Sequence, residues 1–262
     1  MSLGTRVDGA LFDLTGHAAI VTGGGSGIGL GFAQGLSRAG ASVALWGRNP
    51  DKLHTAAELL RVHGNPVVTM SCDVADENAV RDAMDRTVGE FGRLDSCFAN
   101  AANEGSLVPF LDTSLDQFRS VTAVNLDGAF LTLREAARHM VRFGNGGSLV
   151  VTSSIGSKFG MPRNQAYGAA KAGVIAMVSG IAVEMSRYGI RANSVLPGWV
   201  ETPMTKSGFA DARLADNVLP RIPQRRWGTP GDFSAIAVYL ASPASSYHTA
   251  DTILIDGGYS VF

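Results

Sequence analysis

The chain has 262 residues, 45% of them hydrophobic, which supplies a sizeable core and excludes global disorder. Its formal net charge of −1 gives no electrostatic reason to expect nucleic acid or an anionic membrane as a partner. A signal peptide is not expected, because its long apolar region is missing from the first residues, and no apolar stretch approaches the ~20 residues that span a bilayer. We therefore expect a cytoplasmic protein.

Short β-branched runs alternate with longer amphipathic stretches along almost the whole chain. The runs are apolar on both faces, which is typical of strands in a buried parallel sheet. Because neighbouring parallel strands need right-handed crossovers, this alternation predicts an α/β fold with a doubly wound, seven-stranded parallel sheet and helices on both faces. The predicted strands are 18–22, 42–46, 66–70, 94–99, 148–153, 191–196 and 252–255.

Three of the helical patterns between the strands, 29–39, 51–63 and 77–91, are each followed by a glycine. A glycine at this position favours a left-handed C-cap that ends the helix. The glycines are Gly40, Gly64 and Gly92.

The chain shows no linker, repeat or low-complexity segment. We therefore expect a single domain over 14–262, preceded by an N-terminal extension over 1–13 whose first three residues resemble an expression remnant. The segment 199–227 is long for a connection and is interpreted as a substrate lid. Cys72 and Cys97 lie in apolar runs and are expected to be reduced core thiols. Histidines and acids show no ligand-like spacing, so no metal is expected.

Small and polar residues follow the predicted strands, where the carboxyl ends of a parallel sheet form one ligand-binding edge. The first strand leads into a glycine-rich turn that opens a helix, whose N–H groups and positive dipole end favour a phosphate. Gly23 permits the tight turn. Gly27 lets the backbone approach a pyrophosphate, and Gly29 allows the helix to pack closely against the strand. A flexible loop would show the same letters, but this position between strand and helix favours a dinucleotide site.

Tyr167 and Lys171 are four residues apart, so on a helix they share one face. A lysine cation nearby favours the phenolate, so we expect it to bring the tyrosine pKa down from about 10 toward the working range. Ser154 precedes Tyr167 by thirteen residues, at a strand end where its hydroxyl could stabilise charge on a substrate oxygen. By residue type alone, the adjacent Ser153 could fill the same role.

The chain resembles the short-chain dehydrogenase/reductase family from about residue 14 to its last residues. The residues that carry the resemblance are TGGGSGIG at 22–29, ANAA at 99–102, Asn125, Ser153 with Ser154, YGAAK at 167–171 and PGWVET at 197–202. The family implies a Rossmann-type fold. Two departures from its pattern are Ala102 and Ala250, which stand where the family commonly has glycine.

The resemblance implies roles for individual residues. Tyr167 would be the catalytic acid and base, Lys171 would also hold the nicotinamide ribose, Ser154 would hold the substrate oxygen, and Asn125 would organise a water relay to the lysine. The cofactor residues implied by the resemblance or by the turn itself are Gly23, Ser26, Gly27, Ile28, Gly29, Arg48, Asn49, Asp73, Val74, Asn100, Ala101, Tyr167, Lys171, Pro197, Gly198, Val200 and Thr202.

NADP(H) is the expected cofactor, with NAD(H) as the alternative. An NAD site generally has a carboxylate about 20 residues beyond the glycine turn, where this chain has Gly47. Arg48 can instead grip a 2′-phosphate through its guanidinium, and Ser26 can offer a hydroxyl. The competing interpretation is that Arg48 caps a loop and points to solvent.

The expected reaction interconverts a secondary alcohol and a carbonyl by hydride transfer, with a small molecule as substrate. The ending and the segment 221–233 look most like bacterial enzymes that act on sugars, sugar acids or polyols, but similar segments occur in ketone and 3-ketoacyl reductases. Lys158 and Arg163 could meet an anionic substrate or lie in a solvated loop.

The alternative to an enzyme is a non-catalytic protein that binds the dinucleotide and senses redox state. A homotetramer is expected, because the helix around 167–187 carries small and apolar residues on several faces.

Overall fold

The computed structural model describes residues 9–209 and 212–262. Seven strands form one parallel sheet in the order β3-β2-β1-β4-β5-β6-β7, so the predicted doubly wound fold is confirmed. The strands are β1 Ala18–Thr22, β2 Ser42–Gly47, β3 Val67–Ser71, β4 Ser96–Ala99, β5 Gly147–Thr152, β6 Ile190–Pro197 and β7 Thr252–Ile255. Most of the N-terminal extension expected over 1–13, and residues 210–211 of the expected lid, lie outside the described residues.

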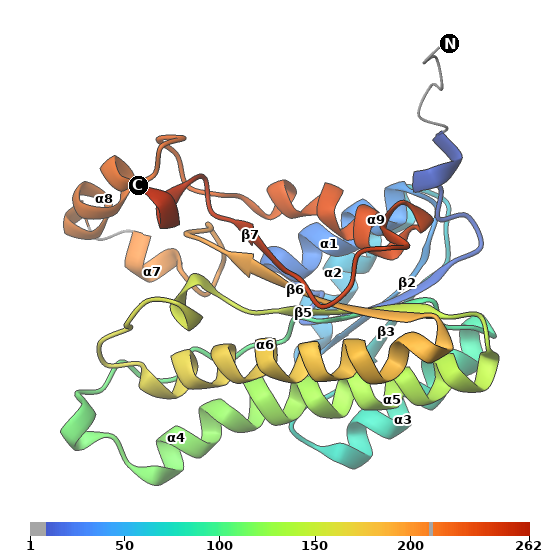
Figure 1. Ribbon diagram of the computed structural model, residues 1–262, viewed down its shortest axis with the longest axis horizontal. Helices are drawn as coiled ribbons and strands as arrows, with labels where there is room; N and C mark the ends of the chain where they lie inside the picture. The colour runs from blue at the N-terminus through green and yellow to red at the C-terminus, as the bar shows by residue number, and fades with distance from the viewer. Residues whose placement is uncertain (1–8, 210–211) are drawn as a thin grey trace.

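Helices cover both faces of the sheet (Figure 1). The helices α3, α5 and α6 pack on one face, while α1, α2 and α9 pack on the other. The helices are α1 Gly27–Arg38, α2 Pro50–Arg61, α3 Glu77–Phe91, α4 Leu115–Thr122, α5 Gly128–Phe143, α6 Gln165–Met185, α7 Lys206–Phe209, α8 Ala212–Val218 and α9 Ser234–Ala241.

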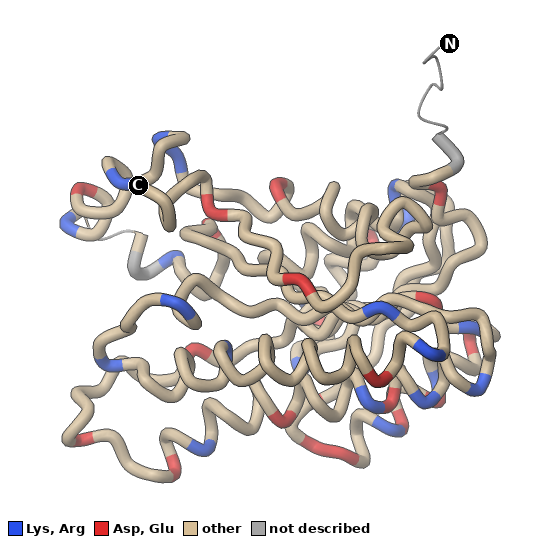
Figure 2. The backbone as a smooth tube through the Cα atoms, in the orientation of Figure 1, with Lys and Arg blue, Asp and Glu red and all other residues tan. Residues whose placement is uncertain are grey.

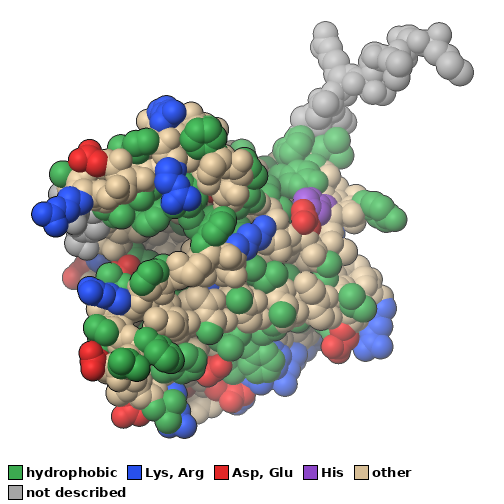
Figure 3. Space-filling model, turned by 60° about the vertical axis from the view of Figure 1, so that its left-hand side comes forward, with side chains coloured by type: hydrophobic (Ala, Val, Ile, Leu, Met, Phe, Trp, Pro, Cys, Tyr) green, Lys and Arg blue, Asp and Glu red, His purple; other side chains and the backbone are tan. Residues whose placement is uncertain are grey.

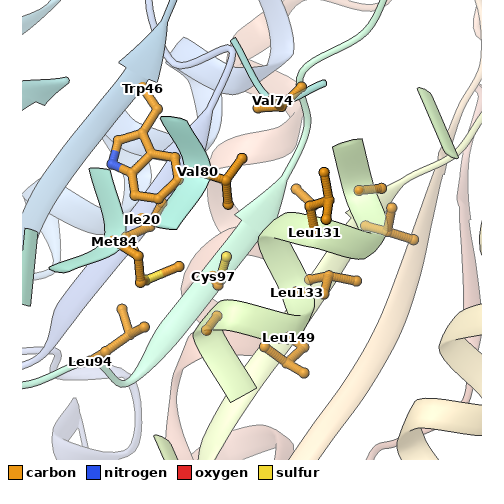
Figure 4. Packing of buried hydrophobic residues seen from close by; sticks show 14 of the residues in the cluster. Ile20, Trp46, Val74, Val80, Met84, Leu94, Cys97, Leu131, Leu133 and Leu149 are labelled. Atoms are coloured by element: carbon orange, nitrogen blue, oxygen red, sulfur yellow. The ribbon is translucent and has the colours of Figure 1, made fainter. Parts of the chain in front are cut away.

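The two layers follow from the period of the strands, because successive side chains point to opposite faces of the sheet. Ile20 of β1 belongs to the core beneath α3, α5 and α6, whereas its neighbours Ala19 and Val21 belong to the core beneath α1, α2 and α9. Figure 4 shows the first of these cores, where residues of β1, β2 and β4 face residues of α3 and α5. The labelled residues from these five elements are Ile20, Trp46, Cys97, Val80, Met84, Leu131 and Leu133.

Two strands begin later than the sequence predicts, and both starts have a physical reason. Strand β3 begins at Val67 because Pro66 has no N–H for the ladder, although its carbonyl oxygen accepts from Val43 N–H at 3.0 Å. Strand β4 begins at Ser96 because the Asp95 carboxylate, rather than a backbone group, accepts the Ala18 N–H at 2.8 Å.

The predicted left-handed glycine C-cap is confirmed for α3, at Gly92, whereas α1 and α2 have Ala39 and Val62 as C-caps and reach their glycines one and two residues later. Gly40, Gly64 and Gly92 all have left-handed φ angles, of 102°, 81° and 70°. Ala250, which stands where the family commonly has glycine, has a φ of 63°, a conformation that glycine adopts without strain. Alanine therefore holds a strained turn immediately before β7.

The expectation that no apolar stretch is long enough to span a bilayer is wrong for one helix. The segment Gln165–Tyr188 is 24 residues long with a hydropathy of 1.5, which by length and composition alone is enough to cross a membrane. In the fold this helix packs against β6 and α4, which is typical of a core helix.

Cys72 and Cys97 are buried and unpaired, and burial raises the pKa of their thiols to about 11 and about 12.

Acidic and basic residues are interspersed along the outside of the molecule (Figure 2), as the small net charge suggests. Many hydrophobic side chains nevertheless reach the surface (Figure 3). Among them are Phe118 on α4, Phe130 on α5 and Val183 on α6, the last 78% exposed. The helices of one layer therefore keep apolar surface that the sheet does not cover.

Candidate active site

The carboxyl ends of β1, β4 and β5 are joined by side-chain hydrogen bonds. The Thr22 hydroxyl accepts from the N–H groups of Asn100 and Ala101, both at 2.9 Å. The Asn100 amide in turn donates to the Thr22 carbonyl oxygen and accepts from the Thr152 hydroxyl at 3.0 Å. The Asn100 side chain therefore fixes three strand ends. The sequence gives Thr22 and Thr152 no such role, because only the pairing of the strands shows that they face Asn100.

The glycine turn has the backbone that its sequence predicts. Gly23 and Gly27 have left-handed φ angles of 64° and 55°, which other residues rarely adopt. A Cβ added to Gly29 would lie 2.5 Å from Asn100 Nδ2, so glycine is required where α1 meets the strand ends. Ser26 is the N-cap of α1, but its side chain makes no capping hydrogen bond. Its hydroxyl and the first N–H groups of the helix can therefore meet an anion.

Arg48 and Asn49 follow β2, beside the glycine turn. The Asn49 side chain is the N-cap of α2 and accepts from Lys52 N–H at 2.9 Å. Arg48 is exposed, and no other described residue forms a hydrogen bond or ion pair with its guanidinium. A phosphate could therefore approach it without displacing an internal partner.

The remaining predicted cofactor residues lie at the same edge. Asp73 accepts from Ala75 N–H at 3.1 Å, and Val74 is buried against Gly128. On the far side, Gly198 packs against Asp256, and Thr202 lies in contact range of Gly27. The chain after β6 thus returns to the glycine turn. Pro197 ends β6, and Val200 is buried where it bridges to Gly228.

Ser154, Tyr167 and Lys171 come together where β5 ends and α6 begins. The Ser154 side chain lies close enough to Tyr167 to lower the pKa of the tyrosine, and its oxygen accepts from Gly156 N–H at 3.1 Å. Lys171 Nζ lies 5.5 Å from the centre of the Tyr167 ring. The predicted juxtaposition of the three side chains is therefore present.

Ser153 has a different surrounding from Ser154. Its hydroxyl is buried and donates to the Lys171 carbonyl oxygen at 2.7 Å, which fastens the end of β5 to α6. Since this hydroxyl is engaged in the backbone of the helix, Ser154 is the serine that faces Tyr167.

The ionisation of Tyr167 differs from the expected direction. Burial raises its pKa to about 12, and the nearby Ser154 side chain only partly offsets this effect. Lys171 is itself buried, which lowers its pKa to about 8, and its Nζ donates to the Thr152 carbonyl oxygen at 2.8 Å. The lysine charge is therefore directed at a backbone dipole, so at neutral pH Tyr167 is a proton donor.

Asn125 lies in a π-helical turn, Ala123–Asp127, between α4 and α5. Such turns interrupt regular helix hydrogen bonding and are frequent at functional sites. The buried amide donates to the carbonyl oxygens of Asn103 at 2.6 Å and Val121 at 2.8 Å. Its Oδ1 is buried without a hydrogen-bond partner, so it is an acceptor that a water molecule would satisfy.

The segment 199–227 contains α7, α8 and a cluster of aromatic rings. Phe209 and Trp227 stack with ring centres 4.2 Å apart, and Trp199 lies 6.3 Å from each of them. Trp199 also packs edge-on against Tyr259 near the carboxyl terminus at 6.1 Å. These contacts join distant parts of the chain, so periodicity does not reveal them. In Figure 1, α7 and α8 lie beyond the carboxyl edge of the sheet, opposite the start of α6.

A cavity of about 380 Å³ lies on the β7 side of this segment, and Ser154, Tyr167 and Lys171 do not line it. It borders Trp199, Val200 and Asp256. Within residues 9–209 and 212–262, no three His, Cys, Asp or Glu side chains are placed to hold a metal ion together.

Comparisons with known proteins place this arrangement in a family. A family model described as Enoyl-(Acyl carrier protein) reductase matches residues 23–260. Sorbose reductase of Schizosaccharomyces pombe is 37% identical over 256 residues, covering 95% of this chain and 98% of its own length. The 3-oxoacyl-(acyl-carrier-protein) reductase of Chlamydia pneumoniae is 35% identical over 246 residues, covering 94% and 97%.

Solved structures give the same result. A gluconate 5-dehydrogenase from Burkholderia cenocepacia J2315, crystallised in complex with NADP and tartrate, superposes with a TM-score of 0.91 at 33% identity, covering 97% of this chain and 99% of its own. An NAD⁺-bound xylitol dehydrogenase superposes with a TM-score of 0.89 at 30% identity, covering 94% and 99%.

Proposed function

The chain belongs to the short-chain dehydrogenase/reductase family, and from this premise we propose that it is an NADP(H)-dependent enzyme that interconverts a secondary alcohol and a carbonyl by hydride transfer. Membership establishes an oxidoreductase that acts on CH–OH groups and uses a nicotinamide dinucleotide. The observation that carries the catalytic assignment is the meeting of Ser154, Tyr167 and Lys171 at the end of β5. A domain over 14–262 would hold the whole site, with 199–227 as its lid.

The residues at the sheet edge fit the dinucleotide. The left-handed turn at Gly23 and Gly27, the uncapped start of α1 and the free hydroxyl of Ser26 suit a pyrophosphate. When bound, the nicotinamide would supply or accept the hydride. Lys171 would hold its ribose.

In the reductive direction, Ser154 and Tyr167 would donate hydrogen bonds to the carbonyl oxygen and polarise it. Tyr167 would then pass its phenolic proton to that oxygen as the alcohol forms. A tyrosine whose pKa lies near 12 is protonated at neutral pH and so is ready for this step. Lys171 and a water held by the unpartnered Oδ1 of Asn125 would return the proton.

The proposed preference for NADP(H) over NAD(H) rests on Arg48. Its side chain is exposed beside the glycine turn, and Gly47 leaves no carboxylate at the end of β2 to repel a 2′-phosphate. The similarity to the enzyme solved with NADP supports this assignment, while the NAD⁺-bound relative keeps NAD(H) as the alternative.

For the substrate we propose a sugar, sugar acid or polyol, as the similarity to sorbose reductase and gluconate 5-dehydrogenase suggests. The alternative is a ketone or 3-ketoacyl substrate, which the similarity to the 3-oxoacyl reductase keeps open.

We further propose a cytoplasmic homotetramer. Exposed Phe118, Phe130 and Val183 on α4, α5 and α6 support association through this layer of helices. Light scattering that finds a monomer at micromolar concentration would contradict the assembly.

The test is a screen of ketoses, keto acids, simple ketones and 3-ketoacyl thioesters, following the absorbance of NADPH and, in parallel, of NADH. We expect NADPH oxidation with at least one polyhydroxy carbonyl compound. Tight NADPH binding with no turnover of any compound in the screen would instead favour the redox sensor.

A further inference from the structure

The loop after β4 carries an acidic residue, Glu104, between two backbone anchors. The carbonyl oxygen of Asn103 accepts from the Asn125 amide at 2.6 Å, and that of Glu104 accepts from the Asn164 amide at 2.9 Å. Both donor side chains are buried, at 1% and 6% exposure. Asn164 directly precedes α6, which carries Tyr167 in its first turn. The loop is thus tied to the elements that form the catalytic site.

A tight turn fixes the position of Glu104 further. Gly105 has a φ of 71°, and its N–H donates to the Asn103 side-chain oxygen at 3.0 Å. A Cβ at Gly105 would lie 2.5 Å from Val121 Cγ2, so the residue after Glu104 has no room for a side chain. The backbone of Glu104 is therefore held on both sides rather than carried by a free loop.

The negative charge of Glu104 acts on the reacting group. Burial is the main cause of the raised pKa of Tyr167, and the field of Glu104 adds to it, while partial burial raises the pKa of the Glu104 carboxyl itself. Glu104 as a whole is exposed, and across the described residues no donor or cation is paired with its carboxylate. The anchors to Asn125 and to Asn164, three residues before Tyr167, hold this free acceptor beside the catalytic residues, where it can meet a molecule bound there.

We propose that Glu104 selects the substrate by charge, accepting a hydrogen bond from a substrate hydroxyl and repelling a substrate carboxylate or phosphate. The preferred substrates would then be neutral polyhydroxy alcohols and carbonyl compounds rather than sugar acids or phosphorylated sugars. This inference rests on the proposed function and narrows its substrate class.

The neighbouring cations do not reverse this selection. Arg226 is engaged with Asp232 at 2.7 Å, and Arg221 lies over the ring of Tyr259 at 4.6 Å. Lys158, on the loop after β5, and Arg163, which directly precedes Asn164, are both exposed, so water screens their charges. Glu104 is the charged side chain whose field raises the pKa of Tyr167.

The experiment compares L-sorbose with 5-keto-D-gluconate, in which a carboxylate replaces a terminal hydroxymethyl group. The wild-type enzyme should reduce L-sorbose with the higher kcat/KM. Glu104→Gln should lower kcat/KM for L-sorbose and raise it for the keto acid, chiefly through KM. We expect the ratio of the two values to change by roughly tenfold or more, as for loss of a hydrogen bond to a charged group. Glu90→Gln removes one charge from an exposed position on α3 and should leave the ratio unchanged.

Three outcomes would overturn the inference while leaving the proposed function intact. They are a wild-type preference for the keto acid, a ratio that Glu104→Gln does not move, and turnover of other carbonyl compounds with neither sugar reduced. Absence of NADPH- or NADH-dependent turnover of every carbonyl compound would instead contradict the proposed function itself.

Discussion

Lys171 places its ammonium nitrogen 5.5 Å from the centre of the Tyr167 ring, one turn earlier on the same helix. Both side chains are desolvated, which raises the pKa of the tyrosine to about 12 and lowers that of the lysine to about 8. Burial thus disfavours the charged form of each group, so at neutral pH the tyrosine holds its proton and the lysine is close to losing its own.

This pair predicts opposite pH dependences for the two directions of the reaction. Reduction needs the tyrosine protonated and a charged lysine to resupply the proton, so kcat should be level below about pH 8 and fall above it, where Lys171 loses its charge. Oxidation needs the phenolate, whose population rises with pH up to the pKa of Tyr167, so its rate should increase from neutral to alkaline pH. Rate profiles in both directions check this. A reduction rate that increases with pH between 7 and 9, a range taken as roughly one unit on either side of the lysine pKa, would contradict it.

The two adjacent serines should respond differently to removal of their hydroxyls. Ser154→Ala should lower kcat by roughly a hundredfold or more, because a donor to the substrate oxygen is lost. Ser153→Ala should keep kcat within a few-fold but lower the free energy of unfolding by about 1–3 kcal/mol, because the Lys171 carbonyl oxygen loses its buried donor. Steady-state kinetics and urea unfolding of both variants separate the effects. A catalytic loss confined to Ser153→Ala would reverse the assignment.

The sequence predicted the sheet well, because its strands are apolar on both faces and their ends carry the small and polar residues of the site. It also placed Tyr167 beside Lys171, since that relation depends only on helix period. The interval to Tyr167 favoured Ser154 over Ser153, but the reason that Ser153 is unavailable, a hydrogen bond between β5 and α6, is visible only in the fold. The sequence did not single out Glu104, whose position depends on buried amides from two distant helical segments. Relations that span the fold, including the rings around Trp199, required the structure.

Cofactor preference should depend on Arg48. Wild type should bind NADPH more tightly than NADH, and Arg48→Ala should weaken NADPH binding by roughly ten- to a hundredfold while changing NADH binding little. Fluorescence titrations of both cofactors against both proteins measure this. If wild type prefers NADH, or the variant keeps its full NADPH preference, Arg48 does not hold the 2′-phosphate.

Ala250 offers a test of the strained turn before β7. Its φ of 63° is unfavourable for alanine, so Ala250→Gly should remove strain of about 1–2 kcal/mol, partly offset by about 0.4–1 kcal/mol from the more flexible unfolded chain. A small net gain follows, seen as a Tm higher by about 1–4 °C. Gly89→Ala, on the exposed face of α3 with open space around it, is the opposite change at an ordinary helical position and should also stabilise. A lower Tm for Ala250→Gly would show that the turn is not strained.

The central claim is that the Tyr167 hydroxyl transfers the proton while other residues bind the cofactor. The direct measurement determines kcat and the NADPH dissociation constant on one preparation of Tyr167→Phe, using the best carbonyl substrate of the wild-type enzyme. We predict a loss of kcat of roughly a hundredfold or more, because general acid catalysis supplies about that factor, with NADPH binding unchanged within a few-fold. Turnover near the wild-type rate in this variant would contradict the account.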